Sequence, residues 1–471
     1  MEGQLSKGTV VIVGGGFTGT ATAVNLARLS KAPLKVVVVN KDNLPFRGVA
    51  YSTRNRNHVL NVRAGNMSAL ADEPDHFVKW LRGQEEFRDL PALNHEFVPR
   101  WVFGSYLEDL FSTHAQNAQK GIQLEMLQDE VMDIHQDEEK LIVQFSEGKP
   151  IRADQVILAM GNQKPAPLKI TGLDLNDPRY IGNPWCDWEK RLPDRDKAVV
   201  LAGTGLTMVD VFLTLSNSGW RGKIYGASPH GFLPLTHFKA QDCSDLVDVG
   251  AGILSLREIF SIFKYNYRLC QTQGIYPAML VDKLRPITSH VWRSWSAAEK
   301  RRFIRHLSAP WNAARHRMAP NVGEQVQRAI GEGRLEIIKG LVRECGSAGE
   351  DLDLRVGTKD KQRSIRAGVL INCTGPQTQH LRFPGESPLL DNLYKSGLAR
   401  TDEMNMGMDI GPDFEVRGAD GRCSERLFAA GTLLKGTFWE TTAVPELRAQ
   451  AFCIARHLTR SSLIQWSGWD I

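Results

Sequence analysis

Two glycine-rich turns occur in this chain, each where an apolar strand should end and a helix should begin. The first places Gly14, Gly16 and Gly19 in GxGxxG spacing directly after the apolar residues 10–13. The first glycine permits a sharp turn, the second lets the backbone approach a pyrophosphate, and the third lets the helix pack closely on the sheet. The start of the helix then presents unpaired N–H groups to the phosphates. We therefore predict a dinucleotide site formed by Gly14, Gly16, Phe17, Thr18 and Gly19.

The second turn follows the apolar residues 198–202 and has Met208 where the third glycine would fall. It predicts a second nucleotide site at Gly203, Gly205, Leu206 and Thr207. A glycine turn in an ordinary strand–helix–strand unit is the alternative. The first turn, however, is followed at the expected distance by a second buried strand, residues 34–39. Two such turns in one chain indicate a flavin and a nicotinamide nucleotide that work together.

The residues that end the following strands should lie near the adenosine ribose of each nucleotide. Asn40 and Lys41 end the first of these strands; a carboxylate is usual there, but an amide oxygen can also accept from a ribose hydroxyl. The second strand, predicted at residues 223–227, is followed by Ser228 and His230, and no carboxylate that would repel a 2′-phosphate ends it. We predict FAD at the first turn and NADPH at the second, with NADH possible and with Ser228 and His230 as coenzyme contacts. The alternative for His230 is that it only caps the loop.

Composition limits the class of protein. The chain has 471 residues, 42% hydrophobic and 24% charged, which is typical of a protein with two or three domains. The net charge of +5 suits phosphorylated cofactors, and no basic run is dense enough to predict a nucleic-acid partner. No apolar stretch reaches membrane-spanning length and residues 1–7 lack the apolar core of a signal peptide, so we expect a cytoplasmic protein with no membrane partner. The seven cysteines contain no CxxC pair, so we expect reduced, structural thiols and no metal site.

The order of elements repeats along the chain. Residues 141–155 and 352–366 each predict a hairpin before a short buried strand, and these strands end at Gly161 and Gly375; a third such strand ends at Gly431. Helix-like spacing appears at residues 254–267 and 297–306. We predict an α/β fold with two dinucleotide-binding (Rossmann-like) domains, the NAD(P)H domain inserted in the FAD domain, and a helical insert. The expected boundaries are 1–175 and 376–471 for the FAD-binding domain, 176–240 and 321–375 for the NAD(P)H-binding domain, and 241–320 for the helical insert.

Segments along nearly the whole chain resemble the FAD/NAD(P)-binding flavoproteins, a family similar in plan to class B flavin monooxygenases and the amino-acid N-hydroxylases. They are residues 47–52, 58–62, 67–69, 74–77, 99–100, 104–107, 316–317 and 436–448. The resemblance implies further flavin contacts: Asn61, Val62 and Met67 beside the isoalloxazine, Arg100 at the pyrophosphate, and Gly161, Gly431, Thr441 and Val444 around the ring. A surface ion pair is the alternative for Arg100.

The resemblance implies an FAD-dependent oxidoreductase that consumes NAD(P)H, with a monooxygenase as the favoured activity. In such enzymes hydride passes to flavin N5, and reduced flavin captures O₂ as a C4a-hydroperoxide that oxygenates a small nucleophile, here an amine or an amino-acid-like metabolite. The alternative is a dehydrogenase or reductase that passes electrons to a quinone, another carrier or a partner protein; a non-catalytic flavin-binding sensor is a third. No catalytic side chain is assigned.

A group of cationic side chains in the expected insert either binds an anionic substrate or covers the cofactor phosphates. They are Arg285, His290, Arg293, Arg315, His316 and Arg317. Core packing is the simpler interpretation for Trp292, Trp295 and Trp311 in the same segment, and it is equally open for Trp439 and Glu440.

Overall fold

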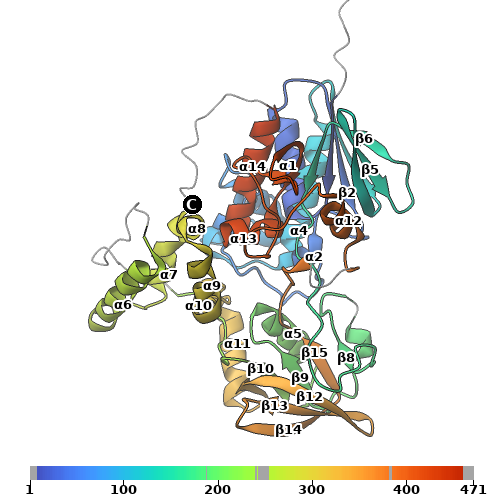
Figure 1. The fold of residues 1–471 in the computed structure, drawn as a ribbon. Coiled ribbons are helices and arrows are strands. Elements are labelled where there is room, and N and C mark those ends of the chain that lie inside the picture. The colour runs from blue at the N-terminus through green and yellow to red at the C-terminus, as the bar shows by residue number, and fades with distance from the viewer. Residues whose placement is uncertain (1–7, 187, 239–240, 242–253, 381–384, 460–471) are drawn as a thin grey trace, which may run out of the picture.

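A six-stranded sheet in the order β16-β17-β7-β1-β2-β3 forms the centre of the larger half of the molecule (Figure 1). A computed structural model describes residues 8–186, 188–238, 241, 254–380 and 385–459. Five strands of the sheet are parallel, and β16 is antiparallel to β17. The strands are β1 (Gly8–Val13), β2 (Leu34–Asn40), β3 (Ile122–Gln128), β7 (Gln155–Leu158), β16 (Glu415–Arg417) and β17 (Cys423–Ala429).

Strands β1 and β2 are nearly continuous runs of β-branched residues, which is typical of parallel strands covered on both faces. Val10 to Val13 pair in register with Val36 to Val39, and all of these side chains are buried. Helices α1 (Phe17–Leu29), α4 (Arg100–Gln116) and α14 (Val444–Thr459) cover one face. The other face is covered by a small antiparallel sheet of β4 (Val131–Asp137), β5 (Lys140–Phe145) and β6 (Ile151–Ala153) (Figure 1).

A second parallel sheet, in the order β11-β10-β9-β15-β8, forms the smaller half. Its strands are β8 (Tyr180–Ile181), β9 (Val199–Ala202), β10 (Ile224–Ser228), β11 (Leu335–Lys339) and β15 (Val369–Asn372). Helices α5 (Leu206–Asn217) and α11 (Pro320–Gly331) pack on one face. The antiparallel strands β12 (Leu341–Ala348), β13 (Asp351–Gly357) and β14 (Gln362–Ala367) pack on the other.

The two halves therefore share one plan, and the predicted fold class is confirmed. The predicted hairpins are β5–β6 and β13–β14, and each precedes a buried strand of its parallel sheet. A third strand in each small sheet, β4 and β12, was not predicted from the sequence. Only Val131 and Ile134 of β4 and Val342 of β12 are buried, so the apolar signal of both strands is weak.

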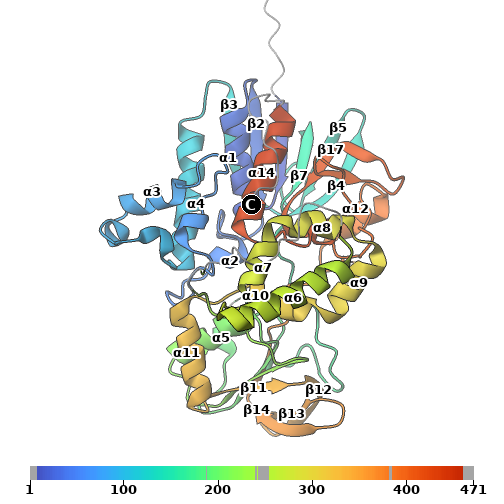
Figure 2. The ribbon, with the colours of Figure 1, turned by 90° about the vertical axis from the view of Figure 1, so that its left-hand side faces the viewer.

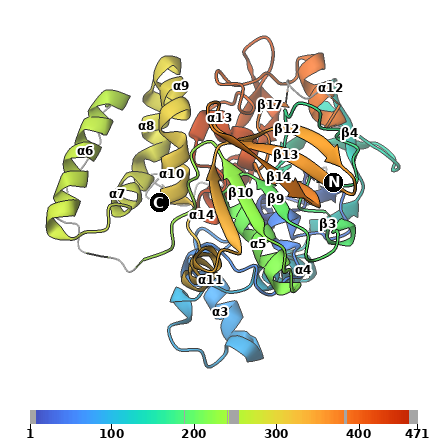
Figure 3. The same ribbon diagram turned by 90° about the horizontal axis from the view of Figure 1, so that it is seen from below.

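Helices interrupt the smaller half between β10 and α11 (Figure 1). They are α6 (Leu256–Gln273), α7 (Met279–Leu284), α8 (Thr288–Ser294), α9 (Ala297–His306) and α10 (Ser308–Arg315). The helices predicted near residues 254–267 and 297–306 are confirmed as α6 and α9. Each begins with a capping box, Ser255 with Glu258 and Ser296 with Glu299. Helix α6 lies farthest from both sheets (Figure 3).

The chain crosses twice between the halves, after β7 and after β15, so the second sheet is inserted between strands of the first (Figure 2). The crossovers contact each other: the amide nitrogen of Asn372 donates to the carbonyl oxygen of Ala166 at 2.9 Å. The shorter helices are α2 (Gly48–Tyr51), α3 (His76–Gly83), α12 (Pro388–Ser396) and α13 (Lys435–Phe438). No helix in the described ranges is long and apolar enough to span a membrane. The six described cysteines are free thiols, and Cys243 lies outside the described residues.

Candidate functional site

The first glycine turn joins β1 to α1 at the carboxyl edge of the larger sheet. Gly14 has a φ of +113°, and a Cβ there would overlap the carbonyl oxygen of Ala159; a Cβ on Gly19 would overlap the carbonyl oxygen of Gly14. Only glycine fits at these two positions. Gly16 precedes α1 without any side-chain cap, and a Cβ there would meet only the backbone of Gly48, at 3.4 Å. The uncapped N–H groups and this open space form a cradle of the kind that binds phosphate.

Asn40 ends β2 beside the same turn. Its side chain is buried, and its amide nitrogen donates to the carbonyl oxygen of Asp42 at 2.7 Å. The amide oxygen consequently lies against Gly15, within 3.1 Å of the point that a Cβ would occupy. Lys41 is exposed instead, and its ammonium pairs with Glu130 at 3.3 Å. Of the two predicted ribose contacts, the structure thus directs only Asn40 toward the turn.

A buried hydrogen-bond network fixes the turn that follows β17. The N–H of Gly431 donates to Gln450 Oε1 at 2.9 Å, Thr441 Oγ1 donates to the carbonyl oxygen of Gly431 at 2.8 Å, and Gln450 Nε2 donates to Thr441 Oγ1 at 2.8 Å. Thr432 Oγ1 donates to the carbonyl oxygen of Gly161 at 2.5 Å, which ties this turn to the end of β7. Gln450 was not predicted from the sequence as part of the site. Its signal was a single polar residue within the apolar stretch 449–455.

The first and last turns converge at the starts of two helices. Phe17 and Thr18 begin α1 and are buried, and Val444 begins α14 with an exposed fraction of 3%. A Cβ on Gly431 would lie 3.5 Å from Thr18 Oγ1. The N-termini of α1 and α14 therefore open on one region of the sheet edge, where their dipoles favour negative charge.

The loop predicted beside the isoalloxazine faces the second half of the molecule. The carbonyl oxygen of Asn61 lies 2.9 Å from His237 Nε2, Val62 is partly exposed, and Met67 is only 2% exposed. The loop is thus held against His237, and the contacts of Asn61, Val62 and Met67 with the isoalloxazine stay a prediction.

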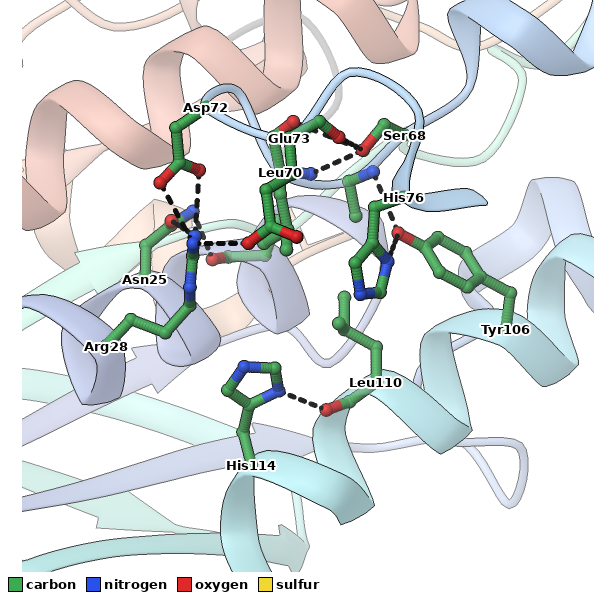
Figure 4. A network of polar contacts seen from close by, with 12 residues as sticks. Asn25, Arg28, Ser68, Leu70, Asp72, Glu73, His76, Tyr106, Leu110 and His114 are labelled. Carbon is green, nitrogen blue, oxygen red and sulfur yellow. Dashed lines mark hydrogen bonds and ion pairs between the residues drawn. The ribbon is translucent and has the colours of Figure 1, made fainter. Parts of the chain in front are cut away.

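Beyond Met67 the loop is held in place by the polar network of Figure 4. The guanidinium of Arg28 on α1 binds both carboxylate oxygens of Asp72 at 2.9 Å and Glu73 at 2.7 Å. Ser68 Oγ donates to the carbonyl oxygen of Glu73 at 2.6 Å, and Tyr106 Oη accepts from the N–H of Ala69 at 3.2 Å. Helices α1 and α4 thus fix the loop from two sides.

Arg100 forms an ion pair that the sequence did not reveal. Its Nη1 pairs with Asp210 Oδ2 on α5 at 2.8 Å, and its Nε donates to the carbonyl oxygen of Val59 at 3.0 Å. Both side chains are largely buried, with exposed fractions of 11% and 8%. The guanidinium therefore joins the two halves of the molecule, and its contact with the flavin pyrophosphate stays a prediction. The positive charge of Arg100 is paired with the carboxylate of Asp210 on α5, a residue far away along the chain.

The second glycine turn repeats the geometry of the first. Gly203 has a φ of +115°, and a Cβ there would overlap the carbonyl oxygen of Cys373. Gly205 precedes α5, and a Cβ there would meet no atom within 4 Å. Leu206 and Thr207 form the first turn of α5 and are partly exposed toward this space. The predicted residues are brought together as a second open cradle.

Met208 occupies the position of the missing third glycine and is fully buried. It packs in the core of the smaller half together with Val209 and Phe212 of the same helix.

Ser228 is the last residue of β10 and His230 lies two positions beyond it, and the two side chains make different contacts. Ser228 Oγ lies 2.7 Å from Thr204 Oγ1 and accepts from the N–H of Gly231 at 3.1 Å, so it closes the loop. His230 is exposed, and its ring stacks on Phe232 at a centroid distance of 5.4 Å. His230 is thus the more accessible of the two for a coenzyme phosphate.

Lys339 is a third residue at this edge that sequence reasoning missed. It ends β11 directly opposite Ser228, it is exposed, and its backbone lies beside Gly231. No hydrogen bond or ion pair engages its ammonium within the described part of the chain. The signal was a basic residue at a strand end, but only the strand order places β11 next to β10.

The cations of the insert are mostly paired with carboxylates, so the predicted anion site there is not supported. Arg285 and Arg315 both contact Glu446 Oε1, at 2.9 and 3.1 Å, and Arg315 also lies 3.2 Å from Glu440. Arg317 pairs with Asp282 at 2.8 Å. The remaining cations do not form a cluster. The guanidinium of Arg293 lies over the Phe438 ring, and the side chain of His290 forms no hydrogen bond or ion pair with the described residues. Burial and, to a smaller extent, the charge of Arg315 lower the pKa of His316 to about 3.

The tryptophans of the insert are core residues. Trp292 and Trp295 pack with Phe303 and with Trp439, whose ring centroid lies 4.9 Å from that of Trp292. Trp311 Nε1 donates to Glu440 Oε1 at 3.0 Å. Packing, the simpler interpretation, accounts for these residues.

Residues 11–163 match the FAD-NAD(P)-binding family model. The matched segment runs from the first glycine turn through Gly161, and its description covers the class of cofactors predicted from the two turns. The resemblance to FAD/NAD(P)-binding flavoproteins is thereby confirmed. A search of curated proteins finds no match.

Solved structures share the fold over almost the whole chain. Ornithine N-hydroxylase from Kutzneria sp. 744, in complex with reduced FAD, NADP⁺ and L-ornithine, is 16% identical, has a TM-score of 0.66 and covers 96% of this chain and 99% of its own. Cadaverine monooxygenase of desferrioxamine biosynthesis from Erwinia amylovora is 11% identical, with a TM-score of 0.63 and coverage of 96% and 94%. Bacillithiol disulfide reductase from Bacillus cereus is 13% identical, with a TM-score of 0.55 and coverage of 97% and 99%. At such identities the similarity shows the fold.

Proposed function

We propose that this chain is an FAD-dependent, NADPH-consuming monooxygenase that oxygenates a small nucleophilic metabolite of the amine or amino-acid type. The observation that carries the proposal is the pair of glycine turns, each at the carboxyl edge of its own parallel sheet and each open at its second glycine. The hydroxylase and monooxygenase of the same fold support oxygenation as the reaction.

The residues around the first turn fit a flavin dinucleotide. Gly16 leaves space for the pyrophosphate and Asn40 offers an amide oxygen for a ribose hydroxyl. At the other end, the network of Gly431, Thr441 and Gln450 holds the start of α14, whose positive dipole favours negative charge on the pyrimidine edge. Bound FAD supplies the two-electron exchange with the nicotinamide and with O₂.

The insert supports the exclusion of water that oxygenation requires. Trp439 follows the last turn and packs against Trp292 and Phe303 of the insert, at centroid distances of 4.9 and 5.2 Å. Glu440 receives the indole N–H of Trp311. The insert is therefore fixed to the larger half beside the last turn, where it limits access of solvent.

Thiol chemistry has no support in the sequence, although the bacillithiol disulfide reductase shares the fold. The sequence has no CxxC pair. Cys373, the thiol nearest the second turn, is 3% exposed, and burial raises its pKa well above the ordinary range. Such a thiol stays protonated and unreactive. The competing activity is therefore electron transfer to a quinone, another carrier or a partner protein.

The assignment of the two turns is tested with Gly16→Ala and Gly205→Ala. Both substitutions fit the folded chain, because neither Cβ meets an obstructing atom. Gly16→Ala should yield folded protein without FAD. Gly205→Ala should keep the flavin spectrum but slow anaerobic reduction by NADPH. Loss of both cofactors in both variants would contradict the division into two sites.

Oxygenation itself is tested by mixing the anaerobically reduced holoenzyme with O₂ in a stopped-flow spectrometer. A long-lived transient in the near-ultraviolet before reoxidation supports the oxygen-activating step expected from the sequence. Direct reoxidation without a transient, together with fast electron transfer to a quinone, would establish the reductase instead. Oxygen consumption coupled to the loss of ornithine, lysine or cadaverine then identifies the substrate type.

A further inference from the structure

A cavity of about 730 Å³ lies outside both glycine turns, and nothing in the proposed function accounts for it. Its walls come from α9, from residues 378–380 of the second crossover, from α12 and from residues 401–407. Helices α9 and α12 lie on the same side of the molecule in Figure 2. None of the residues assigned to the nucleotides lines this cavity.

Two unpaired guanidinium groups dominate its charge. Arg301 and Arg305 are separated by four positions on α9, so their side chains project from one face of the helix. Both are exposed, and within the described residues neither forms a hydrogen bond or an ion pair. The acidic side chain in the lining, Glu403, is already paired with Lys300 at 3.6 Å. Arg301 and Arg305 therefore carry positive charge that no carboxylate of the described residues pairs with.

The part of the lining formed by residues 401–407 is fixed by hydrogen bonds and is partly apolar. Asp402 accepts from the N–H groups of Met404 at 2.7 Å and Met406 at 3.2 Å, which fixes the loop, and both methionines line the cavity. Tyr394 of α12 also lines the cavity, and its hydroxyl is buried without a hydrogen-bond partner among the described residues. Burial lowers the pKa of His380, so this imidazole is neutral and adds no charge.

We propose that this cavity binds an organic dianion, such as a dicarboxylate. Its two acid groups pair with Arg301 and Arg305, and its hydrocarbon part lies on Met404 and Met406. The Tyr394 hydroxyl is positioned to donate to one of the acid groups. A diamine such as cadaverine carries the wrong charge for this cavity. The inference concerns binding and does not depend on the proposed oxygenation.

Calorimetric titration of the full-length holoenzyme with three five-carbon probes tests the proposal. Glutarate carries two negative charges, 1,5-pentanediol is neutral and cadaverine carries two positive charges. We expect saturable binding of glutarate alone. Binding of all three probes, of cadaverine in preference, or of none would overturn the proposal.

Three substitutions on α9 locate the site. Arg301→Gln and Arg305→Gln should each weaken glutarate binding about ten-fold or more, since each removes a charge-assisted pair. Arg305→Lys should restore part of it. Arg302→Gln is the matched control, because it makes the same charge change on the same helix outside the cavity. Equal weakening by Arg302→Gln would mean that only the general surface charge attracts glutarate, and the proposal would fail. Thermal unfolding and flavin content establish that each variant is folded.

Discussion

The ion pair between Arg100 and Asp210 distinguishes two roles for one guanidinium. Nη1 and Oδ2 are 2.8 Å apart, and the side chains are 11% and 8% exposed. Removing one member of a buried pair costs about 3–5 kcal/mol, because the remaining charge is left uncompensated. Arg100→Met should therefore lower the free energy of unfolding by about 3–5 kcal/mol. With an unfolding entropy of about 2.1 cal/mol/K per residue over the 471 residues, each kcal/mol shifts the melting temperature by about 1 °C, so the apparent melting temperature should fall by roughly 3–5 °C.

The double variant carries the decisive information. Asp210→Leu alone should also destabilise the protein, because it leaves the Arg100 guanidinium without its carboxylate. Arg100→Met combined with Asp210→Leu replaces both charges by apolar groups and should recover most of the lost stability, because the desolvation penalty disappears with the pair. The double-mutant cycle should thus show a coupling energy of several kcal/mol. Thermal unfolding of the holoenzyme is followed by circular dichroism and by the fluorescence of released flavin.

A phosphate-binding role predicts a different pattern. If Arg100 holds the flavin pyrophosphate, Arg100→Met weakens FAD binding strongly, Asp210→Leu leaves it intact, and the double variant is as depleted of flavin as Arg100→Met. Absence of coupling together with selective loss of FAD would refute the inter-domain role and restore the prediction made from the sequence.

Three further predictions rest on single side chains. Burial raises the pKa of Asp402 from its ordinary 3.8 to about 6, so the stability that this carboxyl contributes is present below about pH 4 and is lost as the pH rises to 6. Asp402→Asn should therefore raise the free energy of unfolding near pH 7.5 by up to about 3 kcal/mol and leave it unchanged near pH 4, as measured by the melting temperature at each pH. Gln450→Leu removes the acceptor of the buried Gly431 N–H, which should cost about 1–3 kcal/mol and speed FAD release measured by fluorescence; an unchanged release rate would contradict a role for the network. His230→Ala and Lys339→Ala should each lower the NADPH-to-NADH ratio of kcat/KM about ten-fold or more, and the residue whose loss leaves that ratio unchanged does not contact the 2′-phosphate.

Local sterics explain what the sequence could predict. Gly14 and Gly203 stand where a Cβ would overlap a carbonyl oxygen of the neighbouring strand, so the spacing of the glycines already determines the turns. The buried parallel strands can be recognised in the sequence as apolar runs, because both of their faces are covered. Strands β4 and β12 have one half-exposed face, and their weaker pattern was missed.

The ion-pair partners of charged side chains could not be predicted, because each partner is far away in the sequence from the residue that it contacts. Arg100 and Asp210 are separated by 110 positions, and Arg285 and Glu446 by 161. A guanidinium near a nucleotide motif is equally compatible with a phosphate or a carboxylate until the fold brings the carboxylate to it. Lys339 illustrates the converse, since only the order of strands in the sheet places it beside the coenzyme loop.

The distribution of paired charge also bears on the place at which we propose that an anion binds. Counting cations along the sequence points to Arg285 and Arg315, but Glu440 and Glu446 lie within 3.2 Å of them and cancel their field. These carboxylates sit next to the last turn and at the start of α14, so the pairs serve to attach the insert to the larger half. Arg301 and Arg305 on α9, which no carboxylate of the described residues pairs with, line the cavity. An anionic ligand should therefore be sought where positive charge is left unpaired, and its binding should respond to Arg301→Gln while attachment of the insert responds to Glu446→Gln.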